Sequence, residues 1–325
     1  MLNRNQTIWS MVLAAGDGTR LAALTTDATG NAVPKQFCSL AGDGSLLQGA
    51  LGRGAQVAAH ERVCTIVAEK HRHHWRPMLG GMSPDNIVVQ PRNCGTANGI
   101  LLALLRILHR DPLAHIVFLP ADHYVQDEAA LALGLTQLVD HLQAQPGKLL
   151  LLGITPEEAD PELGYIVPGQ RVGSAMHAVT RFVEKPQPER AQALLREGAL
   201  WNSFIFAARG ATLLGLMRER LPETVDAMET ALARDAMHSG GSALRALYER
   251  LPEVDFSRAI VQGAEAQLRV VKSAPCGWTD LGTPKRVVET LRRQRPSVAP
   301  WRRAVQMTPA LVTLASQRAL LQLAG

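Results

Sequence analysis

Short apolar runs alternate with longer stretches of helical spacing through the first half of the chain. Continuous apolar runs bounded by polar residues are typical of strands buried on both faces, and apolar positions three or four apart are typical of helices. We expect strands at 8–13, 63–68, 86–89, 115–119 and 149–154. We expect helices at 46–58, 97–108 and 128–143. This alternation favours an α/β fold with a mixed, mainly parallel sheet and helices on both faces.

The second half of the chain is less regular. Extended segments are expected at 165–167 and 179–183, a helix at 188–197 and a long helical stretch at 211–236. We expect one domain over 1–291, made of a half over about 1–155 and a half over about 156–291. An Arg- and Pro-rich connector and a final helix would occupy 292–325.

The composition of the 325 residues, 46% hydrophobic and 19% charged, is typical of a globular enzyme. The net charge is +5, but five arginines and no acidic residue lie within 292–303, so the rest of the chain is balanced. We therefore expect no nucleic-acid partner, and a solvated connector in preference to a site for an acidic partner. No apolar run reaches the roughly 18 residues of a membrane helix, so no membrane partner is expected.

Cysteine usage and the N-terminus both favour a reducing compartment. Cys38, Cys64, Cys94 and Cys276 are far apart and form no CxxC pair, which is unlike a zinc cluster or a disulfide framework. The apolar run at 11–15 is a poor signal peptide. We expect a cytoplasmic protein.

The first expected strand ends in a glycine turn, Gly16-Asp17-Gly18-Thr19-Arg20. Alternate glycines allow a ligand to approach the main chain, and an arginine matches phosphate. The turn lacks the third glycine of a dinucleotide fingerprint and the ending of a P-loop, so a plain turn is the alternative. A second cationic turn at 33–37, which contains Lys35, favours a polyphosphate site.

Two aspartates occupy turns that could share one ligand. Asp122 follows an expected strand within Pro-Ala-Asp-His, and Asp280 lies in the glycine-flanked turn 276–282. The carboxyl ends of parallel strands form the ligand face of such a sheet. Two carboxylates suit Mg²⁺, which keeps substrate phosphates and water as its other ligands. The alternative for each aspartate is a helix cap or a closed turn.

Three further segments carry polar residues. Lys185 follows Glu184 after an expected strand, and Pro186 indicates that the strand has ended, so Lys185 is a candidate for a phosphate or half of a surface ion pair. The segment 90–97 leads from a strand into a helix and could receive polar ligand groups, although Thr96 as a simple N-cap explains part of it. The histidine-rich segment 70–75 is expected on a solvated helix and without a function.

Nine segments in order resemble the sugar-1-phosphate nucleotidyltransferases and, within them, the mannose-1-phosphate guanylyltransferases. They cover about residues 7 to 290. The segments are LAAGDGTRL (13–21), PKQF (34–37), QPRNCGTA (90–97), PADH (120–123), ELGYI (162–166), FVEKP (182–186), WNSFIF (201–206), EVDFSRAI (253–260) and GWTDLG (277–282).

This resemblance implies a Rossmann-like nucleotide-diphospho-sugar transferase fold and a reaction. A sugar 1-phosphate oxygen attacks the α-phosphorus of a nucleoside triphosphate and releases pyrophosphate. The implied substrates are GTP and a hexose 1-phosphate, mannose 1-phosphate in this subgroup, with Mg²⁺ as the cofactor. Homodimer formation is left open.

The resemblance also implies a role for each residue that matches a motif. Arg20 and Lys35 would hold the departing pyrophosphate, Lys185 the sugar phosphate, and Asp122 with Asp280 the magnesium. The sugar would lie against Gly164, Glu184 and Asn202. The nucleotide would be bound by Leu13, Ala14, Ala15, Gly16, Gly18, Thr19, Gln90, Asn93 and Thr96.

The chain departs from the family pattern in three places. Ala22-Ala23-Leu24 replaces Trp-Pro-Leu at the start of an unusual loop that reaches residue 32, and Phe204 replaces a glycine, which would bring a ring near the sugar. No β-rich C-terminal domain is evident after residue 295. Two alternatives therefore stay open: a non-catalytic regulatory subunit that binds a nucleotide-sugar, and the same chemistry on another sugar 1-phosphate or nucleoside triphosphate.

Overall fold

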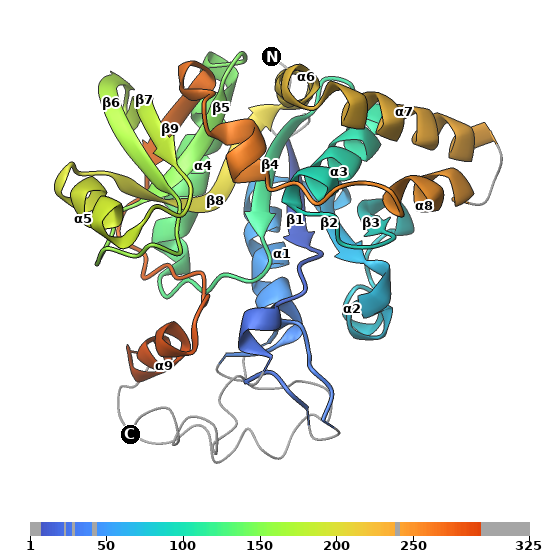
Figure 1. The fold of residues 1–325 in the computed structure, drawn as a ribbon, viewed down its shortest axis with the longest axis horizontal. Helices are drawn as coiled ribbons and strands as arrows, with labels where there is room; N and C mark the ends of the chain where they lie inside the picture. Colours follow the sequence, from blue (N-terminus) through green and yellow to red (C-terminus); the bar gives the residue numbers. More distant parts are fainter. Residues whose placement is uncertain (1–7, 23, 28–29, 41–43, 238–240, 294–325) are drawn as a thin grey trace.

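A mixed nine-stranded sheet organises the part of the chain that the computed structural model describes, residues 8–22, 24–27, 30–40, 44–237 and 241–293 (Figure 1). Its order is β3-β2-β1-β4-β8-β5-β9-β7-β6. The strands are β1 (Ile8–Ala14), β2 (Val63–Ala68), β3 (Ile87–Gln90), β4 (His115–Pro120), β5 (Leu149–Ile154), β6 (Tyr165–Gly173), β7 (Met176–Val183), β8 (Leu200–Arg209) and β9 (Leu268–Lys272).

The five strands expected in the first half are confirmed, and their pairing fixes where a ligand can bind. Strands β3, β2, β1 and β4 are parallel neighbours. The chain moves outward from β1 to β2 and β3 and then returns to the other side of β1 with β4. In sheets with such a change of direction, ligands usually bind outside the carboxyl ends of the strands on either side of it, which are β1 and β4 here.

Antiparallel pairing joins this parallel group to the second half. Strand β8 lies antiparallel between β4 and β5, β5 pairs in parallel with β9, and β7 and β6 complete the sheet. The residue pattern did not predict β8 or β9. The β5–β8 register shifts between Leu151 and Gly153, and Phe204 takes a positive φ of 57°, so regular alternation is interrupted within β8.

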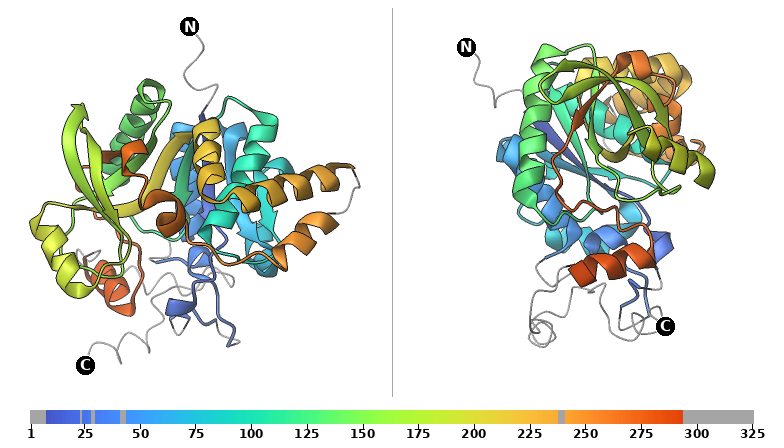
Figure 2. Two further views of the ribbon diagram at one scale, coloured as in Figure 1. Left: turned by 45° about the horizontal axis from the view of Figure 1, so that its top comes forward. Right: turned by 90° about the vertical axis from the view of Figure 1, so that its left-hand side faces the viewer.

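Helices cover both faces of the sheet, as the sequence predicts (Figure 2). Helices α1 and α4 pack on one face, and α3, α6, α7 and α8 on the other. The helices are α1 (Leu46–Val57), α2 (Arg72–Met78), α3 (Thr96–Arg110), α4 (Glu128–Ala144), α5 (Pro188–Arg196), α6 (Gly210–Arg220), α7 (Pro222–Met237), α8 (Ser242–Tyr248) and α9 (Pro284–Arg293).

Local sequence explains where several helices begin. Ser45 and Gln48 form a reciprocal capping box at α1, and the Asp127 side chain accepts a hydrogen bond from Ala130 N (2.9 Å) at the start of α4. The long helical stretch expected at 211–236 is confirmed, but it consists of two helices. Pro222, which lacks an N–H group, begins a new helix, so the stretch is divided into α6 and α7.

Other expectations can be compared with the described residues. All four cysteines are buried and free. None of the described helices is both long and apolar enough to cross a membrane. Arg292 and Arg293 belong to α9, and residues 294–325 of the expected connector and final helix lie outside the described residues.

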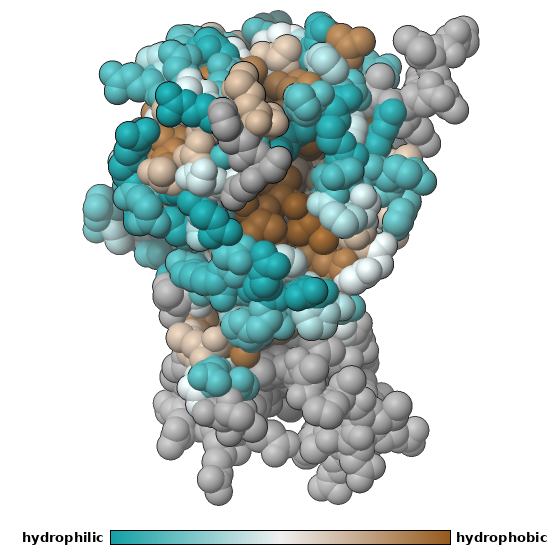
Figure 3. All heavy atoms as spheres, turned by 90° about the vertical axis from the view of Figure 1, so that its right-hand side faces the viewer, coloured by the Kyte–Doolittle hydropathy of each residue, from teal (hydrophilic) through white to brown (hydrophobic). Residues whose placement is uncertain are grey.

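On the side that carries α7 and α8, apolar side chains show in a hollow surrounded by hydrophilic ones (Figure 3).

An aromatic stack anchors β8 in the sheet. The ring of Phe206 stacks on Phe118 of β4 (centroids 4.5 Å apart) and on Phe256 (4.9 Å), and all three side chains are buried.

We predict that Phe206→Ala lowers the free energy of unfolding by about 3–5 kcal/mol, because it leaves a cavity between two rings. Urea unfolding measures this, with Leu133→Ala as a control. Leu133 is 65% exposed, so its truncation should change stability by less than about 0.5 kcal/mol. Equal effects of the two changes would contradict the prediction.

Candidate active site

The glycine turn after β1 and the cationic turn at 34–37 form one unit. A Cβ atom on Gly18, whose φ is +63°, would lie 2.9 Å from the backbone nitrogen of Lys35. The Gln36 amide donates hydrogen bonds to Ala14 O (3.0 Å) and Gly16 O (2.8 Å). The absence of a side chain at Gly18 therefore allows the second turn to pack against the first.

Lys35 connects this unit to both predicted metal-binding aspartates. Its side chain is buried, and Nζ lies 2.9 Å from Asp122 Oδ2 and donates a hydrogen bond to Asp280 O (2.5 Å). Burial acts to raise the pKa of Asp122, but the nearby Lys35 and His123 outweigh it and hold that pKa below its usual value. The carboxylate of Asp122 is thus ionised at neutral pH.

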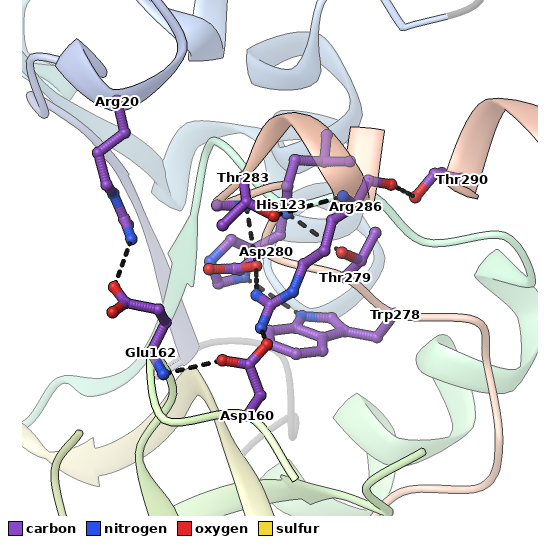
Figure 4. Close-up of polar contacts among 12 residues, drawn as sticks. Arg20, His123, Asp160, Glu162, Trp278, Thr279, Asp280, Thr283, Arg286 and Thr290 are labelled. Atoms are coloured by element: carbon purple, nitrogen blue, oxygen red, sulfur yellow. Dashed lines mark hydrogen bonds and ion pairs between the residues drawn. The ribbon is translucent and has the colours of Figure 1, made fainter. Parts of the chain in front are cut away.

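A backbone N–H group and an arginine hold the carboxylate of Asp280. Its Oδ1 accepts a hydrogen bond from Gly282 N (3.0 Å) and forms an ion pair with Arg286 of α9. Arg286 also pairs with Asp160, from the loop between β5 and β6 (Figure 4). Burial raises the pKa of Asp280. The alternative that Asp280 closes a turn is therefore supported, and it is compatible with a further ligand at the other oxygen.

The donor set at this point fits a hard divalent cation that is shared with a substrate. Asp122 and Asp280 both lie against Lys35, and Oδ2 of Asp280 makes no hydrogen bond within the described residues. No group of three or more His, Cys, Asp or Glu side chains in that part of the chain could hold a metal by itself. Mg²⁺ commonly takes one or two carboxylates and completes its coordination with phosphates and water.

His123 supports Asp122 from the side, a role that the sequence analysis did not assign. Its Nδ1 accepts a hydrogen bond from Trp278 Nε1 (3.2 Å), and its Nε2 lies 3.6 Å from Asp122 Oδ1. Burial lowers the pKa of His123 to about 4, so the ring is neutral at pH 7. Because Nδ1 is the acceptor, the proton sits on Nε2, facing the carboxylate.

Arg20 lies at the exposed rim of the site. Its Nη1 is 3.3 Å from Glu162 Oε2, and both side chains are about half exposed. Glu162 belongs to the motif ELGYI, but the sequence did not reveal this pairing. The structure therefore gives Arg20 an internal carboxylate partner that an anionic ligand would have to replace.

The residues predicted to contact the nucleotide border the glycine turn and α3. Leu13 and Ala14 end β1, followed by Ala15, Gly16 and Gly18, and Thr19 begins a short 3-10 helix. Gln90 is buried at the end of β3, and its Oε1 has no hydrogen-bond partner within the described residues. Asn93 donates to Asp17 Oδ2 (3.4 Å) and accepts from Gly95 N (3.0 Å).

The alternative that Thr96 is a simple N-cap is wrong. Gly95, with a φ of 85°, occupies the N-cap position of α3, and the Thr96 hydroxyl instead accepts a hydrogen bond from Phe256 N (2.8 Å). A Cβ atom on Gly95 would lie 2.3 Å from Val254 O. A distant segment packs here so closely that only glycine fits.

The expectation of a solvated helix at 70–75 is confirmed only in part, since Lys70, Arg72 and His73 are exposed and the other residues are not. His71 and Trp75 are buried, and the indole of Trp75 donates to Ala68 O (2.9 Å). Lys70 Nζ lies 2.7 Å from Asp17 Oδ1 in the glycine turn. This ion pair connects the segment to the glycine turn, a long-range contact that local polarity could not indicate.

The three residues predicted to bind the sugar lie close to one another. Asn202 N donates to Gly164 O (2.8 Å), and a Cβ atom on Gly164 would lie 2.5 Å from Glu184 Oε2. Burial, reinforced by Asp255, raises the pKa of Glu184 to about 7. The next residue, Lys185, is exposed and has a φ of 47°, so the strand has ended before it as expected.

Phe204 does not stand free near this cluster. Its ring makes edge contacts with Phe206 and Phe256, each with centroids 6.0 Å apart. Its N–H donates to Asn202 Oδ1 (3.1 Å), which orients that side chain. The positive φ of Phe204 is a conformation that glycine adopts most easily, which explains how a glycine serves at this position in the family pattern.

Comparisons with known proteins show which family the chain resembles. A model of the family described as "Nucleotidyl transferase" matches residues 9–295. The xanthan biosynthesis protein XanB of Xanthomonas campestris pv. campestris is 34% identical over 280 residues, 84% of this chain and 57% of that protein. The mannose-1-phosphate guanylyltransferase RfbM of Salmonella typhimurium is 31% identical over 285 residues, 84% of this chain and 56% of that protein.

A crystal structure from Thermus thermophilus, described as a mannose-1-phosphate geranyltransferase, is 30% identical with a TM-score of 0.76. The match covers 90% of this chain and 81% of that one. The chain spans slightly more than half the length of the curated relatives that it matches.

We predict that Gly18→Ala and Gly16→Ala differ sharply in stability. Gly18→Ala forces a left-handed residue and pushes on Lys35, so it should lower the free energy of unfolding by about 1–3 kcal/mol. No atom lies within 4 Å of a Cβ on Gly16, so that change should alter stability by less than about 1 kcal/mol. Urea unfolding of both variants is the measurement. An equal loss in the two would show that the turns do not pack as described.

Proposed function

Because the chain belongs to the nucleotidyl transferase family, we propose that it converts GTP and mannose 1-phosphate to GDP-mannose and pyrophosphate. One observation carries the proposal: the buried ammonium of Lys35 holds Asp122 and Asp280 beside the glycine turn. Cationic, carboxylate and backbone groups suited to a triphosphate with its cation therefore meet at one edge of the sheet.

The chemistry requires positioning and charge neutralisation. An oxygen of the sugar phosphate attacks the α-phosphorus of GTP in line, the bond from that phosphorus to the β-phosphate oxygen breaks, and pyrophosphate leaves. Lys35 and Arg20 would neutralise the leaving pyrophosphate, and Lys185 would hold the attacking phosphate. Mg²⁺ bound by Asp122 and Asp280 would supply further charge neutralisation on the phosphates. No protein nucleophile is needed.

The two substrates would occupy different sides of Lys35. The nucleotide would lie along Leu13, Ala14, Ala15, Gly16, Gly18 and Thr19, with Gln90, Asn93 and Thr96 bordering it. The partnerless oxygen of buried Gln90 is suited to an amino or N–H group of a base. The sugar would lie against Gly164, Glu184 and Asn202, where a carboxyl and an amide can bind hydroxyl groups.

The choice of guanine and mannose rests on the names of relatives such as RfbM and on the matching motifs. The division into a nucleotide half before about residue 155 and a sugar half after it, and a cytoplasmic location, belong to the same proposal. Assembly into a homodimer stays open.

We predict that the purified chain releases pyrophosphate from GTP, Mg²⁺ and mannose 1-phosphate. Asp122→Asn and Asp280→Asn should each lower kcat/KM by at least about 100-fold, because each removes a carboxylate charge that would hold the Mg²⁺ neutralising the reacting phosphates. Asp226→Asn is the control, since Asp226 of α7 is exposed and pairs with Arg218 of α6. A coupled pyrophosphate assay gives the rates.

Three outcomes of this assay would contradict parts of the proposal. Retention of activity within three-fold in both site variants would remove the metal assignment. A preference for UTP or dTTP, or for another sugar 1-phosphate, would overturn the specificity. Binding of GDP-mannose without turnover would favour a regulatory subunit.

A further inference from the structure

Arg286 is a buried arginine that holds two carboxylates from different parts of the chain. It lies on α9 with 8% of its surface exposed. Its Nη1 pairs with Asp280 Oδ1, and its Nη2 pairs with Asp160 Oδ2 (Figure 4). Both carboxylates are themselves largely buried. A guanidinium suits this position because its nitrogens are fixed in one plane and can bind two acceptors at once.

The start of α9 fixes the direction of this side chain. Arg286 N donates to Thr283 Oγ1 (3.4 Å), Arg286 O accepts from Thr290 Oγ1 (2.7 Å), and Val287 is buried beside it. These contacts fix the backbone of α9 at Arg286, and the two ion pairs with Asp160 and Asp280 hold the guanidinium.

The consequence for Asp280 is that its two carboxylate oxygens differ. Oδ1 is occupied by Gly282 N and Arg286, and the main-chain oxygen is occupied by Lys35. Oδ2 makes no hydrogen bond within the described residues. Without the guanidinium, only the Gly282 N–H would hold Oδ1, and the carboxylate could rotate about χ2.

We propose that Arg286 is a positioning residue for Asp280: it holds Oδ1 and so leaves Oδ2 as the oxygen available to a divalent cation. This inference rests on the proposed function, in which Asp280 binds Mg²⁺. Partners that orient a metal-binding carboxylate commonly change metal affinity by about 10- to 100-fold when they are replaced. Arg286 acts through Asp280.

The same network reaches the rim of the site. Asp160 Oδ1 accepts a hydrogen bond from Glu162 N (2.8 Å), and Glu162 pairs with Arg20 (3.3 Å). Arg286 therefore ties α9 to the loop between β5 and β6 as well as to Asp280. Replacement of Arg286 should displace Asp280, its direct partner, more than it displaces Arg20.

The direction of the change in metal affinity separates positioning from simple charge. If Arg286 acted only through its positive charge, its removal would strengthen cation binding, because like charges repel. If Arg286 orients Asp280, its removal weakens cation binding. A role confined to the stability of α9 would leave the metal affinity of the folded protein unchanged.

The test uses the full chain and Mn²⁺ as the probe. Water-proton relaxation with GTP present distinguishes protein-bound Mn²⁺ from Mn²⁺ on free GTP. We expect Arg286→Gln to weaken Mn²⁺ binding about 10-fold or more. Arg286→Lys should weaken it less, since an ammonium can hold one carboxylate. The matched control on the same helix is Arg293→Gln, an exposed partner of Glu157 (2.7 Å), which should stay within two-fold of wild type.

Kinetics and folding complete the test. The Mg²⁺ concentration for half-maximal pyrophosphate release should rise in Arg286→Gln, while KM for GTP at saturating Mg²⁺ changes less than three-fold. If circular dichroism shows that Arg286→Gln does not fold, Mn²⁺ binding is measured on Arg286→Lys and Asp160→Asn instead. Asp160→Asn removes the charge of the second carboxylate partner of Arg286 and leaves Asp280 unchanged.

The outcomes distinguish this inference from the proposed function. An active wild type with Mn²⁺ binding equal or tighter in the folded Arg286 variants would overturn the positioning role alone. A wild type that neither releases pyrophosphate nor binds Mn²⁺ would overturn the proposed function and this inference with it.

Discussion

The site depends on one buried ammonium group. Lys35 is 5% exposed, and a buried ammonium without partners would be strongly destabilising. Asp122 supplies a carboxylate and Asp280 supplies a main-chain oxygen. These partners come from the end of β4 and from the turn before α9, 245 residues from Lys35 in the latter case. Satisfying Lys35 therefore requires that three distant segments meet, which assembles the site as a consequence of folding.

The ion pairs of the site differ in how far they are exposed to solvent. Both side chains are buried in the pair of Arg286 with Asp280, only the lysine is buried in the pair of Lys35 with Asp122, and both side chains are about half exposed in the pair of Arg20 with Glu162. Exposed pairs contribute only about 0–1 kcal/mol. A phosphate can therefore replace Glu162 at Arg20 with little loss, while the pairs that contain a buried side chain keep their geometry. The exposed rim is suited to exchanging ligands, and the interior is suited to holding them in position.

The sequence predicts those parts of the fold in which local pattern and tertiary position agree. β1 and β2 are apolar because both of their faces are buried, and α1 carries its own capping box, so their existence and type were predictable. β8 was not, because Phe204 interrupts its alternation. The helical stretch expected over 211–236 is present, and its division into two helices at Pro222 was not predicted, because periodicity alone does not take account of a proline.

In the candidate site, too, residues within a sequence motif were predictable and residues placed by tertiary contacts were not. Motif resemblance brought Lys35, Asp122 and Asp280 into one hypothesis, and Gly164, Glu184 and Asn202 into another. It could not reveal Arg286 or Glu162, since their partners come from loops that are distant in sequence and carry no local signal. His71 was assigned to solvent because polarity is a local property, whereas its burial follows from packing near Phe37 and Asp17.

The most direct test of this account is a double-mutant cycle on the pair between Lys35 and Asp122. The free energy of unfolding in urea is measured for wild type, Lys35→Met, Asp122→Asn and the double variant, without metal or substrates. The account predicts a coupling energy of about 1–3 kcal/mol, with the double variant less destabilised than the sum of the single changes. A coupling energy near zero would mean that Lys35 does not hold these segments together, and would contradict the account.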